Sequence, residues 1–400
     1  MLRINPSLAF LAVFAPTLCA QSGLLVSGYG SQSIHRYDEI SGAPLGVVAA
    51  APGAQSLRYG PDGCLYACAE EQDRVLKLDG STGAFLANFV ADDPATTGVD
   101  ESGGLDAPTA AIFGPDGNLY VASFSQNRVL RYDGATGQYL GIFVAAGSGT
   151  LSGPDAGMTF GPDGNLYVPS FNNNRVLRYD GKTGAFLDAF VSQAEGVSRP
   201  RMLRFRSDGK LYVTSWGNNK VARFDLNGVL IDNFVPSVTR PTGLVFDPVN
   251  GDLLITSDQT SDVKRFDGAT GASKGTFIPA NSGGLAGGTY LEYLPDREYT
   301  FERLSPGTAG VTNTIDLHGA TPNSTSYLLY GFAPQALKAG PCGHAWLGVQ
   351  IVGLLPIPMD ATGEFHIDVA LPIELAGAKL YLQAFDLPTC RVTNLVIQTF

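Results

Sequence analysis

The sequence predicts an all-β protein in which a six-bladed β-propeller is followed by a small β-sandwich. Three observations lead to this prediction. A segment of the chain recurs at intervals of 41 to 54 residues, each copy contains four short apolar runs, and the repeat is incomplete at both of its ends. Repeats of about this length, with four strands each, are typical of β-propellers.

The repeat is best preserved in residues 114–134, where Gly-Pro-Asp-Gly-Asn-Leu-Tyr-Val-Ala-Ser is followed by Asn-Arg-Val-Leu-Arg-Tyr-Asp-Gly. It returns almost unchanged at 161–181, and weaker copies stand at 60–80, 207–228 and 250–268. One aspartate closes the third apolar run of every copy. These residues are Asp38, Asp79, Asp133, Asp180, Asp225 and Asp267.

Each copy has the composition of four antiparallel strands. In one copy the apolar runs cover 110–113, 119–123, 128–132 and 139–144, and they are rich in Val, Tyr and Phe. Short runs bounded by Gly, Pro, Asp and Asn are typical of strands rather than helices. Pro-Asp-Gly after the first run and Asp-Gly-Ala-Thr-Gly after the third supply tight turns, because their glycines accept a positive φ.

The incomplete copies determine the number of blades. Residues 24–50 contain the second, third and fourth strands of a blade, whereas 285–297 contain only a first strand and its turn. We expect the two pieces to pair in one sheet. This pairing of N- and C-terminal strands closes a ring of six blades and removes its open edges.

The repeat resembles the NHL-repeat propellers and, more broadly, the six-bladed group that includes gluconolactonase-like and streptogramin-lyase-like proteins. The resemblance rests on the two motifs quoted above and covers roughly 24–297. It implies the propeller fold, but the group contains binding scaffolds as well as hydrolases and lyases. NHL blades usually carry Ala-Asp after the second strand, where this chain has Ala122-Ser123, Pro169-Ser170 and Thr214-Ser215.

The two ends of the chain differ from the repeat. Residues 1–20 resemble a secretory signal, with Arg3 followed by an apolar run too short for a membrane span. We therefore expect a secreted, periplasmic or cell-surface protein with a propeller at 21–300 and a second domain at 301–400. In that domain Phe365, Ile367 and Val369 alternate with polar or small residues, as in a sandwich strand. We expect it to serve either as a packing or stability module or in surface attachment or sorting.

The cysteines suit an exported chain. Cys64 and Cys68 lie four residues apart on one expected strand, so they are about 13 Å apart and too distant to pair. Cys342 and Cys390 flank strands of the last hundred residues, and we expect a disulfide between them. The formal charge of −11 argues against a nucleic-acid binder. We expect a monomer without a membrane span.

The loops of a propeller blade fall on two opposite faces. The repeated Pro-Asp-Gly and Asp-Gly-x-Thr-Gly turns lie on one face, here called the turn face. The loops between second and third strands lie on the other, the loop face, together with the variable connections between blades at 91–108, 145–157, 192–200 and 280–288. Variable loops on a fixed scaffold favour a functional role.

The loop face carries aromatic rings beside amide groups, a combination that suits a glycan, peptide or protein ligand. In the alternative interpretation, the rings pack between blades and the asparagines cap turns. Asn127, Asn174 and Asn219 recur before the third strand, and Arg131, Arg178, Arg223 and Arg265 recur within it, so we expect both sets to be structural. The candidate ligand-binding residues are Tyr29, Phe124, Phe171, Asn172, Trp216, Asn218 and Asp258.

The alternative function is a metal-dependent lactonase or other hydrolase, or a lyase. A lactonase of this fold needs oxygen ligands for a metal at the channel mouth, and a lyase needs a base such as histidine. The only histidine of the repeat is His35, away from the mouth, and Asp155 with Arg201 is the best polar pair. The residues expected at the channel mouth are Ser56, Thr109, Asp155, Arg201, Thr242 and Gly288.

No residue set requires a cofactor. The connection after the first full copy is nevertheless acidic, and carboxylates are the ligands that calcium prefers. We keep calcium binding as an alternative to a solvated insertion there. The residues concerned are Asp92, Asp93, Asp100, Glu101 and Asp106.

Overall fold

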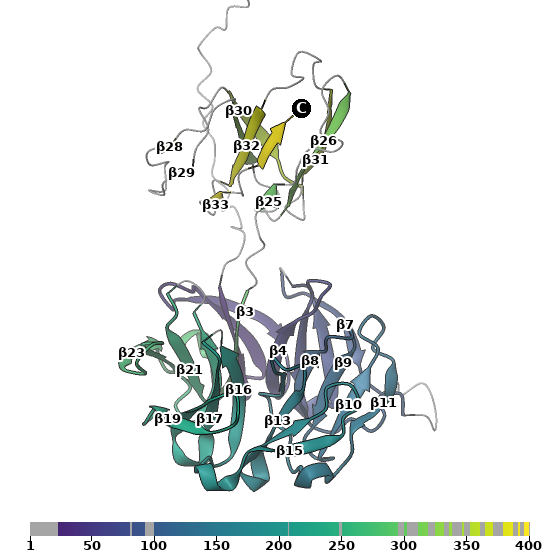
Figure 1. Ribbon diagram of the computed structural model, residues 1–400, viewed down its shortest axis with the longest axis vertical. Coiled ribbons are helices and arrows are strands. Elements are labelled where there is room, and N and C mark those ends of the chain that lie inside the picture. The colour runs from purple at the N-terminus through teal and green to yellow at the C-terminus, as the bar shows by residue number, and fades with distance from the viewer. Residues whose placement is uncertain are drawn as a thin grey trace, which may run out of the picture. The chain divides into compact units, whose positions relative to one another are not determined.

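The computed structural model describes most of residues 23–294 and a set of strands beyond them (Figure 1). Two compact units can be distinguished, and the propeller unit spans Gly23–Leu294. The signal segment 1–20, Asp93, Cys342 and Cys390 lie outside the described residues, so the predictions about them stay predictions. The described residues are 23–80, 82–92, 100–206, 208–247, 250–294, 300–301, 311–318, 325–331, 336–337, 346–347, 353–360, 365–370, 379–386, 391–392 and 396–399.

The propeller unit consists of six four-stranded antiparallel sheets, which confirms the predicted fold. Figure 1 shows β4, β8 and β16 toward the middle, with β11, β19 and β23 at the rim. Blade 1 contains β4 (Ala54–Tyr59), β5 (Leu65–Ala69), β6 (Arg74–Leu78) and β7 (Phe85–Val90). Blade 2 contains β8 (Pro108–Phe113), β9 (Leu119–Ser123), β10 (Arg128–Tyr132) and β11 (Tyr139–Val144). Blade 3 contains β12 (Thr159–Phe160), β13 (Leu166–Ser170), β14 (Arg175–Tyr179) and β15 (Phe186–Val191).

The remaining blades follow the same order, and the last of them joins the two ends of the unit. Blade 4 contains β16 (Pro200–Arg206), β17 (Lys210–Ser215), β18 (Lys220–Phe224) and β19 (Leu230–Val235). Blade 5 contains β20 (Pro241–Phe246), β21 (Leu253–Ser257), β22 (Val263–Phe266) and β23 (Ser273–Ile278). The closing blade contains β24 (Gly288–Tyr293), β1 (Leu24–Gly28), β2 (Ser33–Tyr37) and β3 (Pro44–Ala50). Short 3₁₀ helices lie in the loops at Glu70–Gln72, Ser148–Thr150, Phe171–Asn173, Gln193–Glu195, Trp216–Asn218 and Ser282–Gly284.

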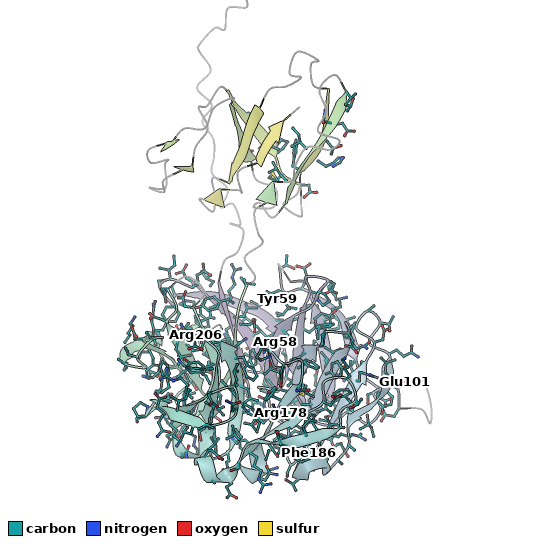
Figure 2. The ribbon with its side chains drawn as sticks, viewed as in Figure 1. Arg58, Tyr59, Glu101, Arg178, Phe186 and Arg206 are labelled. Carbon is teal, nitrogen blue, oxygen red and sulfur yellow. The ribbon has the colours of Figure 1, made fainter. Side chains whose placement is uncertain are left out.

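Closure of the ring occurs as the incomplete repeats predicted. β1 pairs antiparallel with β24, with Leu24 opposite Tyr293 and Ser27 opposite Tyr290. Arg58 of β4, labelled near the middle of the propeller in Figure 2, pairs with Glu292 of β24 at 3.0 Å. The C-terminal strand of the unit thereby completes the sheet of β1, β2 and β3 and closes the ring of blades.

The turn face is built from one repeated set of contacts. In blade 2 the Asp116 carboxylate accepts a hydrogen bond from the Asn118 backbone N–H at 3.1 Å and another from the Tyr120 hydroxyl at 2.9 Å. Gly117 supplies the positive φ of 79° that the turn requires. The same aspartate–tyrosine contact recurs in other blades, in the pairs Asp62–Tyr66, Asp163–Tyr167 and Asp208–Tyr212.

The core between blades is made by these tyrosines. The Tyr120 ring is 1% exposed and packs edge-on against Phe143 of its own blade and Phe160 of the next, at centroid distances of 4.7 and 5.2 Å. Burial of one such ring contributes about 2–3 kcal/mol. The recurring arginines stack on the phenylalanine of the fourth strand and are structural as predicted, in the pairs Arg131–Phe143, Arg178–Phe190, Arg223–Phe234 and Arg265–Phe277.

The strands beyond residue 299 form antiparallel sheets of their own. One contains β25 (Thr300–Phe301), β26 (Thr312–His318) and β31 (Phe365–Ala370). Another contains β30 (Gly353–Pro358), β27 (Thr325–Gly331), β32 (Lys379–Asp386), β33 (Arg391–Val392) and β34 (Val396–Thr399), and β28 (Ala336–Leu337) pairs with β29 (Trp346–Leu347). The predicted strand at Phe365 is present, and the sandwich itself stays a prediction.

Candidate functional site

The loop face is anchored by the recurring asparagines. Asn174 has a φ of 59°, and its side-chain oxygen accepts a hydrogen bond from the Arg199 backbone N–H at 2.9 Å. Asn127 does the same for Gly153, and Asn219 for Arg240, both at 2.8 Å. Each asparagine therefore joins its loop to the connection that enters the next blade. Their structural role is as predicted.

Three of the predicted aromatic residues form one continuous group, here called the aromatic arc. Phe124, Phe171 and Trp216 come from blades 2, 3 and 4, and neighbouring ring centroids lie 6.1 and 5.8 Å apart. All three side chains are half-buried, so each keeps part of its surface in solvent. The arc thus offers a ready-made apolar surface on the loop face.

The other predicted loop residues lie apart from the arc or serve the loops. Tyr29 of the closing blade is near Glu70 and Glu71, and its pKa is raised by burial and by these two carboxylates. The Asn172 amide donates to the Ser152 hydroxyl at 3.3 Å, and the Asn218 amide to the Gly196 carbonyl at 2.7 Å. For these two asparagines, the turn-capping alternative describes the contacts better than the ligand-binding one.

Trp216 is fixed by a residue from the next blade. Its indole N–H donates to the Asp258 carboxylate at 2.8 Å, and Asp258 lies 3.5 Å from a guanidinium nitrogen of Arg201. Asp258 follows the second strand of blade 5, where the neighbouring blades carry an aromatic ring. The aromatic arc is therefore connected through Asp258 to Arg201 of β16.

A cluster centred on Arg201 lies where the innermost strands of the blades begin. Its guanidinium donates to Asp155 of blade 3 at 3.1 Å and to Gln55 of blade 1 at 3.1 Å, and the Gln55 amide donates to Glu70. The Arg201 side chain is 12% exposed and that of Asp155 only 3%. Burial opposes the charge on Arg201, but Asp155 and Asp258 outweigh it and raise the guanidinium pKa.

Glu70 is the carboxylate of this cluster whose charge is least compensated. Burial is the main cause that raises the pKa of Glu70, and the negative charge of Asp155 raises it further. The hydrogen bond from the Gln55 amide and the positive charge of Arg201 lower this pKa in part. The cluster thus joins blades 1, 3, 4 and 5 through one half-buried cation. The pair Asp155–Arg201 is the salt bridge that the sequence suggested.

The other residues expected at the mouth have a different role. Thr109 and Thr242 are 2% and 1% exposed, and their hydroxyls donate to the carbonyls of Pro154 and Gly288, each at 2.7 Å. The Ser56 hydroxyl accepts from the Ala111 N–H at 3.1 Å. These contacts join neighbouring blades. That Thr109 and Thr242 line the channel mouth stays a prediction, and their hydroxyls are used in contacts with the backbone of the next blade.

The residues relevant to catalysis are dispersed. His35 is 2% exposed, its ring nitrogen lies 2.8 and 2.9 Å from the hydroxyls of Ser31 and Ser33, and burial lowers its pKa. Over the part of the chain that the structure describes, no three His, Cys, Asp or Glu side chains converge on a metal position. Among the calcium candidates, the Asp100 carboxylate accepts a hydrogen bond from the Ser102 backbone N–H, and the Asp106 carboxylate accepts one from the Gln126 side-chain amide.

Sequence reasoning missed four residues of the loop face. Gln55 and Glu70 reach the Arg201 cluster, whereas Arg199 and Arg240 lie beside Trp216. For the two arginines a signal existed, since both stand directly before the proline that begins a first strand, where other blades have glycine or alanine.

Comparison with known proteins supports the fold. No family model and no curated protein matches this sequence. A chain of the nidogen/laminin complex is similar in structure, with a TM-score of 0.54 and 15% identity over 68% of this chain and 97% of that one. Virginiamycin B lyase from Staphylococcus aureus has a TM-score of 0.45 and 17% identity over 62% of this chain and 78% of that one. A streptogramin B lyase has a TM-score of 0.46 and 15% identity over 64% of this chain and 83% of that one.

The sheet topology, together with the similarity to the chain of the nidogen/laminin complex, defines the class of the molecule, a six-bladed β-propeller. Sequence identity this low supports a shared fold but does not determine the activity. Among the residues that the structure describes, no helix has the length and apolar character to cross a bilayer.

Proposed function

We propose that this chain is an exported binding protein whose loop face holds a glycan, peptide or protein ligand. The observation that carries the proposal is the aromatic arc of Phe124, Phe171 and Trp216, half-buried and in mutual contact across three blades. A surface held rigid before the ligand arrives loses little entropy on binding. The indole hydrogen bond to Asp258 is the contact that keeps Trp216 in place.

The Arg201 cluster favours binding over the hydrolase or lyase alternative. A metal-dependent lactonase requires carboxylates that converge on an open position. Here Asp155 and Asp258 converge on the Arg201 guanidinium, a cation supplied by the protein itself. The arrangement stabilises the blades, and both carboxylates are already paired with Arg201.

The test is a glycan and peptide array probed with the purified chain and with Phe171→Ala. Buried aromatic anchors commonly contribute 2 kcal/mol or more to binding, so affinity should fall about 30-fold. Phe186→Ala is the matched control, because this ring, labelled in Figure 2, lies on the outer strand β15 and is 42% exposed. Equal affinities of Phe171→Ala and the unaltered chain would contradict the proposal, and turnover of a bound compound would favour the enzymatic alternative.

A further inference from the structure

Two arginines occupy backbone positions that disfavour them. In all six blades, the residue directly before the innermost strand or bridge has a positive φ. A positive φ costs glycine little but is uncommon for a bulky residue. The residues and their φ values are Gly53 (65°), Ala107 (50°), Gly153 (64°), Arg199 (50°), Arg240 (36°) and Gly287 (61°).

The surrounding structure holds these arginines in their unfavourable conformation. Their backbone N–H groups donate to Asn174 and Asn219, at 2.9 and 2.8 Å. The equivalent bond of blade 3 is made by Gly153, so this contact requires no arginine. Because strained backbone is commonly retained where it serves a function, the two side chains need an explanation.

Both guanidinium groups are positioned over the aromatic arc. The Arg240 guanidinium carbon lies 4.3 Å from the Trp216 ring centroid, and that of Arg199 lies 5.4 Å from Trp216 and 5.7 Å from Phe171. The two carbons are therefore at most about 10 Å apart, since both are measured from the same ring. Cations at these distances are attracted by the ring face, which restricts their movement.

The charge of this pair is not compensated. Both arginines are exposed, and within the described residues no carboxylate forms an ion pair with either guanidinium. Arg201, two residues after Arg199, differs completely, because Asp155 and Asp258 both pair with it. Arg199 and Arg240 are thus preoriented donors that keep their hydrogen-bonding capacity for another molecule.

We infer that Arg199 and Arg240 form a carboxylate-binding pair that recognises an Asp or Glu side chain of a peptide segment laid along the aromatic arc. This inference rests on the proposed binding function. The planar guanidinium fork matches a carboxylate in two parallel hydrogen bonds. Phe124 and the exposed part of Phe171 then contact apolar groups of the same segment.

Two features favour an acidic peptide over other anionic ligands. The chain has a formal charge of −11, which repels an extended polyanion while two local arginines still attract a single carboxylate. The Trp216 ring already contacts two guanidinium groups, and its N–H is used by Asp258, so it offers little free surface for a sugar ring.

The experiment uses the whole chain and an array of short peptides in matched pairs that differ only by Asp against Asn or Glu against Gln. The unaltered chain should bind the acidic member of a pair at least about 10-fold more tightly, with affinity falling as salt rises. Arg199→Gly and Arg240→Gly should each reduce the affinity for the acidic peptide about 10-fold. The variant that carries both substitutions should no longer distinguish the acidic peptide from its amide partner. Arg199→Lys should restore binding only in part, because lysine lacks the fork.

Stability measurements separate this role from a structural one. Glycine suits the positive φ at both positions, so the glycine variants should keep the thermal midpoint of the unaltered chain. The matched control is Arg131→Gln, which removes a stacked arginine of the third strand and should leave peptide affinity unchanged.

The outcomes are distinguishable. Equal affinity for the acidic and amide members of each pair, or glycine variants with a clearly lowered thermal midpoint, would overturn the inference. Binding of a glycan or a neutral peptide that is insensitive to both arginines would overturn it as well, yet leave the proposed binding function in place. Absence of binding on every array would overturn both.

Discussion

The turn face and the loop face of the propeller are made by the same six sheets, yet they differ in how their polar groups are used. On the turn face, aspartates such as Asp116 and Asp163 repeat identical contacts with the chain next to them. On the loop face, Arg201 joins four blades in an arrangement that occurs once among the residues that the structure describes. The repeated contacts specify the scaffold, and the single arrangement gives the molecule its individual surface.

The largest effect is expected from the tyrosine layer that both faces depend on. Tyr120→Ala removes a fully buried ring that packs against Phe143 and Phe160, and should lower the free energy of unfolding by about 3–5 kcal/mol. Denaturant unfolding with fluorescence detection measures this change. Tyr120→Phe is the control and should lose only about 1 kcal/mol, because the ring stays and the hydrogen bond to Asp116 is lost. Similar decreases in the free energy of unfolding for both variants would show that packing of the ring is not its main contribution to stability.

A smaller effect is expected when the two faces are compared directly by removing one carboxylate from each. Asp155→Ala leaves the half-buried Arg201 with Asp258 as its remaining ion-pair partner, and should cost about 2–3 kcal/mol. Asp163→Ala, on the turn face, removes a carboxylate that is 36% exposed and should cost about 1 kcal/mol. Chemical unfolding of both variants in the same buffer provides the measurement. If Asp163→Ala proved the more costly, the importance we assign to the Arg201 cluster would be wrong.

The smallest effect concerns the response of the turn face to acid. Hydrogen bonds from Thr270 lower the pKa of Asp267 from its ordinary 3.8 to about 2, and the pKa values of Asp133 and Asp180 are lowered in the same way. A folded-state pKa below the unfolded one means that this stability is present above about pH 4 and is lost as the pH falls toward 2. Thermal midpoints measured across this range should fall less steeply for Asp267→Ala than for the unaltered chain. Parallel curves would contradict the assignment.

Most of the propeller could be predicted from sequence because its determinants are local. The Pro-Asp-Gly turn and the aspartate after the third strand each act within a few residues, so their repetition along the chain reveals the strands. Ring closure could be predicted as well, since the incomplete blade at 24–50 lacked the strand that 285–297 supplies.

The loop face was harder to predict, because its contacts join residues far apart in the chain. The hydrogen bond between Arg201 and Gln55 spans 146 positions and depends on the side-chain directions at the start of two innermost strands. Periodicity alone placed Thr109 and Thr242 at the same mouth, although their short side chains reach neighbouring backbone instead. The aromatic rings were found because they recur at one loop position, whereas the arginines beside them occur in two blades, at a position where the other blades have glycine or alanine.

The pairing of β1 with β24 also has a consequence for biosynthesis. While the polypeptide is still emerging from the ribosome, five sheets can be completed in succession, each from a continuous stretch of chain. The sixth has to wait with three strands until Gly288–Tyr293 has been translated. A nascent chain that stops before this point keeps an unsatisfied strand edge for as long as it exists, and holding it apart from other chains then becomes a task for chaperones.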